Sequence, residues 1–180
     1  MTQNGNSRGF TAMLADKLKH PGRNDIIGMI RWASVLGVIV FMIASSASGR
    51  MSKTDISEVR ACIEANADLT DMLPGDDAAL RRLYGLDAAE FDGYILYTPK
   101  SNMNAEELLI IKLADKSQKQ AVEDEFNARL DTQKNSFEGY GIEQFDLLEN
   151  SSVAKVTSGY GMFIVRKDQA VLYSAVKKVL

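Results

Sequence analysis

A long stretch without charge near the N-terminus narrows the choice of fold more than any other feature of this chain. No charged side chain occurs between Arg31 and Arg50, and residues 35–43 in its middle are apolar apart from one glycine. These eighteen neutral residues would form a helix of about 27 Å at ~1.5 Å per residue, against a hydrocarbon thickness of about 30 Å. Residues 26–30 can lengthen it. The sequence therefore predicts that residues 26–48 enter a lipid bilayer as a membrane anchor or signal segment.

The charges before this segment predict its orientation. Basic residues are retained on the cytoplasmic side of a membrane, and Lys17, Lys19, Arg23 and Arg31 lie on the N-terminal side of the charge-free stretch. We therefore expect a single-pass protein of the cell membrane with a cytoplasmic basic tail over residues 1–25. A linker over 49–54 and an extracytoplasmic domain over 55–180 would follow.

A cleaved signal peptide is the alternative, and it would make the protein secreted. The small residues Ser45, Ser46 and Ala47 suit cleavage near Ala47. The basic leader would then be about thirty residues long, which exceeds most complete signal peptides, so the sequence favours the uncleaved anchor. A buried core helix is disfavoured because charges flank the segment.

Net charge excludes one class of partner. The chain carries a net charge of −3, divided into +3 over residues 1–31 and −6 over residues 50–180. An acidic outer domain repels a phosphate backbone and releases none of its counterions, so we expect no nucleic-acid partner.

Capping signatures predict the helices of the outer domain. An aspartate before an apolar run commonly accepts the first free backbone N–H groups of a helix, and glycine commonly ends one. We expect helices from Asp55 to about residue 67, from Asp76 to Gly85, for one turn after Asp87, after Asp115 over residues 116–136 with a stop at Gly139, over a short stretch from Ile142, and after Asp168.

Aromatic and branched residues predict four strands, over residues 94–98, 108–113, 153–158 and 162–166, of which the last two form a hairpin. The second run is apolar on both faces, which is typical of a central strand. The fold class is therefore α+β. We expect a four-stranded, mainly antiparallel sheet in a ββαββα core, with the two major helices on one face and short helices before it.

Residue types argue against most catalytic systems. His20 is the single histidine and lies before the apolar segment, so the outer domain lacks the histidine of a Ser-His-Asp, Cys-His or histidine-ligated zinc site. Cys62 is alone and forms no internal disulfide. We predict no catalytic, cofactor-binding or metal-binding residue and no cofactor.

Acidic residues leave two weaker possibilities open. A pair such as Glu106 with Asp131 or Glu143 has the residue types for acid/base work on a glycan, although most of these carboxylates are expected to be caps and solvated groups. Asp71, Asp76 and Asp77 lack the spacing of a calcium loop.

Four tyrosines form the candidate binding surface. If Tyr94, Tyr97, Tyr140 and Tyr160 gather on one face, they offer a contact for a sugar or a protein. Packing at the edges of the core is the alternative interpretation. The absence of tryptophan from residues 50–180 argues against a dedicated sugar platform.

Three segments carry a family resemblance: residues 84–86, residues 97–108, and residues 133–144 with their Phe-Glu-Gly-Tyr-Gly run. They resemble the bacterial family known as domain of unknown function 4358, over roughly residues 63–178. The resemblance implies a small exported protein, often lipid-anchored, with no agreed activity. No lipid-attachment cysteine is present here, so tethering would fall to the membrane helix.

These observations together predict a membrane-tethered, extracytoplasmic interaction or accessory module of the bacterial cell envelope, without intrinsic catalysis. Its partner would be an unidentified envelope protein or polysaccharide. The alternatives are an envelope enzyme that uses paired carboxylates on a glycan, and a purely structural scaffold.

Overall fold

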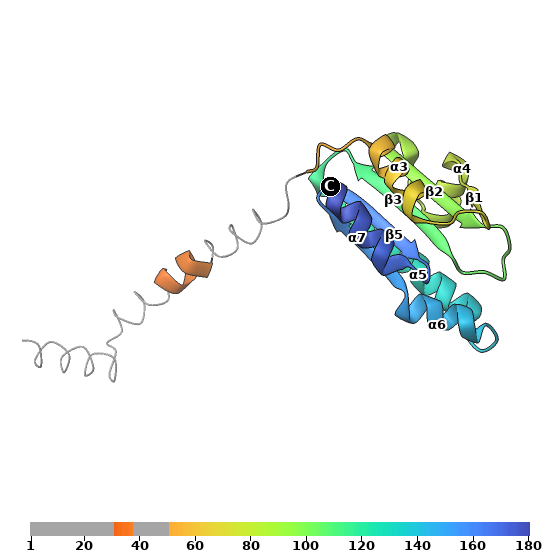
Figure 1. Cartoon of the computed structure of the whole chain (residues 1–180). Helices are drawn as coiled ribbons and strands as arrows, with labels where there is room; N and C mark the ends of the chain where they lie inside the picture. Colours follow the sequence, from red (N-terminus) through yellow and green to blue (C-terminus); the bar gives the residue numbers. More distant parts are fainter. Residues whose placement is uncertain (1–30, 38–50) are drawn as a thin grey trace, which may run out of the picture. The chain divides into compact units, whose positions relative to one another are not determined.

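The computed structural model describes residues 31–37 and 51–180, and the chain divides into two compact units, Met1–Ser48 and Gly49–Leu180. Residues 31–37 form a helix. Within the described ranges, no helix combines the length and the apolar content that a membrane crossing requires. The predicted tail over residues 1–25 and most of the predicted anchor over 26–48 lie outside the described residues (Figure 1).

The second unit is built on a five-stranded antiparallel sheet (Figure 1). The predicted α+β class, the four predicted strands and the central position of the second of them are confirmed. A fifth, very short strand was not predicted. In the order β1-β2-β3-β5-β4, the strands are β1 (Met72–Pro74), β2 (Phe91–Pro99), β3 (Glu107–Leu113), β5 (Tyr160–Val165) and β4 (Ser152–Thr157).

The helices begin close to the predicted caps. Carboxylates of Asp55, Asp76 and Asp115 each accept a backbone N–H at the start of a helical segment, and Gly85 ends α4 in the left-handed conformation at φ 68°. The helical elements are α3 (Ile56–Asn66), α4 (Asp77–Tyr84), η1 (Ala88–Glu90), η2 (Lys116–Gln118), α5 (Lys119–Phe137), α6 (Ile142–Asn150) and α7 (Gln169–Val179).

The helices cover both faces of the sheet, and the prediction that the two major helices share one face is wrong. Leu109 and Ile111 of β3 pack in a cluster with residues of α4, α5 and α6. Leu108 and Ile110 point the other way and pack with residues of α3 and α7. Because successive side chains of a strand alternate in direction, a strand that is apolar at every position needs a helical layer on each side.

The domain has two ends, of which one contains the start and the last residues of the domain and the other contains the β2–β3 loop and α6. At the end that we call proximal, Ser52 N–H donates to Ser158 O at 2.7 Å, and Thr54 Oγ1 donates to Val179 O at 2.6 Å, so the chain enters and leaves the domain side by side. β3 ends there, and its seven residues, roughly 20 Å at ~3.3 Å per residue, extend back to its first residue at what we call the distal end. The loop between β2 and β3, the end of α5, and α6 lie at this distal end (Figure 1).

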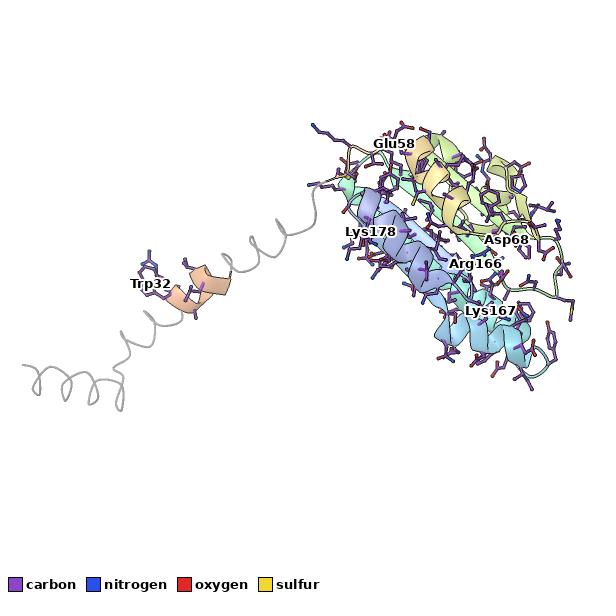
Figure 2. The ribbon with its side chains drawn as sticks, viewed as in Figure 1. Trp32, Glu58, Asp68, Arg166, Lys167 and Lys178 are labelled. Atoms are coloured by element: carbon purple, nitrogen blue, oxygen red, sulfur yellow. The ribbon has the colours of Figure 1, made fainter. Side chains whose placement is uncertain are left out.

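A buried arginine joins three segments on the α3 and α7 side. Arg166 is 6% exposed; its guanidinium donates to the Asp168 carboxylate at 2.8 and 3.2 Å and to Asp68 O at 3.0 Å (Figure 2). Burial lowers the pKa of Arg166, but the hydrogen bond to Asp168 and the charges of Asp168, Glu106 and Asp68 together raise it above its usual value. Asp168 precedes α7 as predicted, but the prediction that its side chain caps the helix is wrong because the carboxylate binds Arg166.

Arg166→Met is expected to lower the free energy of unfolding by about 2 to 3 kcal/mol, because it removes the charged hydrogen bonds through which the buried guanidinium joins Asp168 and Asp68. Lys167→Met, at the adjacent exposed position, is the matched control and should change stability by no more than about 0.5 kcal/mol. Urea denaturation of the two variants measures the difference. Equal effects would contradict the structural role of Arg166.

Candidate functional site

The four predicted tyrosines do not share one surface. Tyr160 is fully buried on the α3 and α7 side, where its hydroxyl donates to Thr54 O at 2.6 Å, and Tyr97 packs partly buried on the same side. Tyr94 packs on the α4 and α5 side and donates to Asp77 Oδ1 at 2.5 Å. Tyr140 is 65% exposed in the turn between α5 and α6. Tyr140 is therefore the most exposed member of this group.

Two of these hydroxyls are held in the protonated form. Burial, followed by the hydrogen bond to Asp77, raises the pKa of Tyr94 to about 12. Burial, followed by the charge of Asp55, raises the pKa of Tyr160 to about 12. Both act as hydrogen-bond donors that hold the fold together.

Of the carboxylate pairs considered from the sequence, Glu106 and Asp131 are not brought together. Glu106 acts electrostatically on Arg166, on the α3 and α7 side. Asp131 is exposed on α5, which covers the other face, and Glu143 is exposed in the first turn of α6. Among the residues that the structure describes, no group of three or more metal-ligating side chains converges.

A different carboxylate, which the sequence analysis did not single out, lies buried at the distal end of β3. Glu107 is 0% exposed. Its Oε1 accepts from the Tyr84 hydroxyl and from Arg129 Nε at 3.2 Å, and its Oε2 accepts from Arg129 Nη2 at 2.6 Å and from Gln133 Nε2 at 2.9 Å. Two donors reach each oxygen, so the acceptor capacity of the carboxylate is filled.

The local sequence explains how the donors reach Glu107. Arg129 and Gln133 are four residues apart on α5, so they lie on one side of the helix, one turn apart. Tyr84 ends α4, immediately before the left-handed turn at Gly85. Burial and the charge of Glu107 raise the pKa of Tyr84 well above its usual value. Burial lowers the pKa of Arg129, but its interactions with Glu107 and Tyr84 together raise it above its usual value.

A polar cavity of about 470 Å³ lies over this buried network. Glu107, Arg129 and Gln133 belong to its wall. The remaining lining consists of four hydroxyl or amide side chains, three apolar ones and one further arginine: Thr98, Asn102, Asn104, Ser136, Leu83, Pro99, Phe137 and Arg82.

Gln133 leaves one polar atom of this wall unused. A carboxylate without a proton accepts hydrogen bonds but does not donate them, so the amide nitrogen of Gln133 must face Glu107 and its Oε1 must face away. Gln133 is 6% exposed, and its Oε1 has no donor among the described residues. A buried acceptor without a partner costs free energy.

Beside the cavity lies a second feature, an exposed apolar patch made of Met103, Tyr140 and Ile142. Their exposed fractions are 67%, 65% and 82%, and they line one groove between the β2–β3 loop and the start of α6. The amide of Gln144 ties these segments together by accepting from Ala105 N–H at 2.8 Å.

Glycines in the turn shape this patch. Gly139 has φ 85°, and a Cβ at Gly141 would stand 2.6 Å from Cδ1 of Phe137. The chain therefore reverses tightly over the buried Phe137. The reversal leaves Tyr140 at the surface between the two glycines.

The fold and the distal end define an α+β domain with a charged network beneath a polar cavity and an apolar patch beside it. Residues 65–165 match the family described as Domain of unknown function (DUF4358), so the chain belongs to this family, as the resemblance predicted. No curated protein and no solved structure matches the chain.

The segments that carry the family resemblance also form most of the cavity. Of its eleven lining residues, five fall within residues 97–108 and three within residues 133–144. Tyr84 and Gln133, which bind Glu107, also fall within the three segments. The resemblance is thus concentrated around the cavity and the network beneath it.

Glu107→Gln is expected to destabilise the domain by about 2 to 3 kcal/mol, because it replaces the carboxylate partner of Arg129 and places an N–H₂ group against existing donors. Glu106→Gln, one residue away, is the matched control and should stay within about 0.5 kcal/mol. Thermal and urea unfolding measure both. If the two variants unfold alike, Glu107 does not hold the distal end together.

Proposed function

We propose that this domain is a non-catalytic interaction module of the bacterial cell envelope, which docks another envelope protein through the apolar patch at its distal end. The exposure of Met103, Tyr140 and Ile142 in one groove carries the proposal. Single exposed apolar residues are ordinary, but adjacent large ones that form a groove are typical of interaction surfaces.

The charges around the patch indicate the chemistry of the partner. Residues 138–150 carry four carboxylates, namely Glu138, Glu143, Asp146 and Glu149, and no basic side chain. The neighbouring Lys134 is engaged by Glu149 at 2.5 Å. A complementary partner segment therefore carries apolar side chains flanked by basic ones.

The state of Glu107 supports a binding role over acid/base catalysis. A catalytic carboxylate must exchange a proton or attack a substrate, and both oxygens of Glu107 are occupied by side-chain donors. The glycan-hydrolysing alternative needs two converging carboxylates, and Glu106 and Asp131 lie on different sides of the sheet.

The placement of the patch suits a tethered module. The domain begins at its proximal end, next to Val179, and the patch lies at the other end of β3. In our proposal residues 26–48 anchor the chain in the membrane with the tail over 1–25 in the cytoplasm. The distal end would then be presented away from the attachment point of the tether.

An alkaline phosphatase reporter fused after Leu180 should be active, because this enzyme needs an oxidising compartment to form its disulfides. Mass spectrometry of the mature protein should find the original N-terminus if the anchor is uncleaved, and a new one near residue 48 if the segment is a signal peptide. An inactive reporter on the inner side of the membrane would overturn the proposed location.

Docking can be measured by photocrosslinking in intact cells, with the reactive amino acid at position 140 and, as a control, at position 171 on α7. We expect a discrete adduct from position 140 and none from position 171. Ile142→Lys should abolish the adduct from position 140, because it removes apolar area and brings positive charge to a surface that meets a basic segment.

Val171→Lys is the matched control for this substitution, since Val171 is 63% exposed and Ile142 82%. Both variants should unfold at the wild-type midpoint because neither side chain is buried. Equal loss of the adduct in the two variants, or equal adducts from positions 140 and 171, would show that the patch is not the docking surface.

A further inference from the structure

The wall of the polar cavity above Glu107 contains guanidinium N–H groups that have no acceptor among the described residues. Arg129 donates hydrogen bonds from Nε and Nη2 to Glu107, and no described residue accepts a hydrogen bond from its Nη1. Its side chain is 17% exposed and lines the cavity. Arg82 lines the same cavity from α4 and forms no ion pair within the part of the chain that the structure describes.

The balance of charge in the cavity differs in sign from that of the domain. Two guanidinium groups face one carboxylate whose acceptor positions are already filled, which leaves an excess of one positive charge. Residues 50–180 carry a net charge of −6. A local cationic site in an acidic domain attracts an anionic group specifically, because the surrounding surface repels it.

The uncharged side chains of the cavity wall also determine which chemical groups a ligand must carry. Thr98, Asn102, Asn104 and Ser136 offer hydroxyl and amide groups. Hydroxyl and amide groups both donate and accept hydrogen bonds, so they suit the hydroxyl groups of a ligand. A ligand that uses both arginines and this wall therefore joins an oxyanion to O–H or N–H groups.

We propose that this cavity binds an acidic sugar, with its carboxylate or phosphate at Arg82 and Arg129 and its hydroxyl groups along the amide and hydroxyl wall. The volume of about 470 Å³ lies in the range of small-molecule sites. Phe137 supplies an apolar surface within the same wall. This site is separate from the proposed protein-docking patch, and the proposal for it does not depend on that function.

Isothermal titration calorimetry of the full-length chain tests the proposal with four probes: glucuronate, glucose 6-phosphate, glucose and inorganic phosphate. At least one of the two acidic sugars should bind with a Kd of about 1 mM or tighter, and glucose and inorganic phosphate at least about tenfold more weakly. The stronger of the two acidic sugars identifies carboxylate or phosphate as the preferred anion. Binding of glucose equal to that of both acidic sugars, or no binding of either acidic sugar, would overturn the proposal.

Two pairs of variants locate the binding. Arg82→Gln should weaken the acidic sugar about tenfold, whereas Arg81→Gln should not, because Arg81 is paired with Asp87 at 2.7 Å and lies outside the cavity. Ser136→Asp should weaken binding through repulsion, whereas Asn135→Asp, at the next exposed position of α5, should leave it unchanged.

All four positions are exposed, so the variants should fold like the wild type. Equal weakening by Arg81→Gln and Arg82→Gln would assign the binding to general surface charge and refute a site in the cavity.

Discussion

The burial of β3 on both of its faces is the constraint on which the rest of the domain depends. Leu108, Leu109, Ile110 and Ile111 are all 0% exposed in the middle of the sheet. Burying a large aliphatic side chain contributes about 1.5 to 3 kcal/mol, and exposing either face of this strand would forfeit several such contributions. Helices are therefore required on both sides, which places α5 over one face and α7 over the other.

The hydrogen-bond network at the distal end forms because this buried strand begins with a charged residue. Glu107 is the first residue of β3 and points toward α5, so the fold buries a carboxylate together with the apolar side chains that follow it. An isolated buried charge would cost far more than the domain's stability can support. Four hydrogen bonds, donated by Arg129, Gln133 and Tyr84, offset the free energy of burying this charge. Arg129 and Gln133 also line the cavity.

Local features of the fold were predictable from the sequence, because caps, turns and apolar runs act over a few residues. The caps at Asp55, Asp76 and Asp115 and the central strand are examples. β1 was missed because three residues that include Pro74 carry no strand pattern of their own, and they form a strand by pairing with the end of β2.

The distribution of helices was mispredicted although the sequence held the information. A run that is apolar at consecutive positions implies two covered faces, so assigning both major helices to one face left half of β3 without a partner layer.

The candidate site was less accessible to sequence analysis than the fold, because its contacts join residues far apart in the chain. Arg129 and Gln133 are visibly one helical turn apart, but nothing local indicates that Glu107, more than twenty residues earlier, is their shared partner. A charged residue that opens an otherwise apolar strand is the signal that was present. Tyr94 and Tyr160 were singled out for their type, and burial in the core then determined their roles.

Phe137 explains how the cavity and the apolar patch coexist at one end of a small domain. It lines both of them, and its ring centroid lies 6.1 Å from that of Tyr140. At 6% exposed and in contact with the tight turn at Gly141, this ring forms a fixed wall between the two. Charged and polar groups converge on one side of it, and apolar side chains project on the other. A sugar and a protein partner would therefore meet different chemistry at neighbouring positions, without competing for the same atoms.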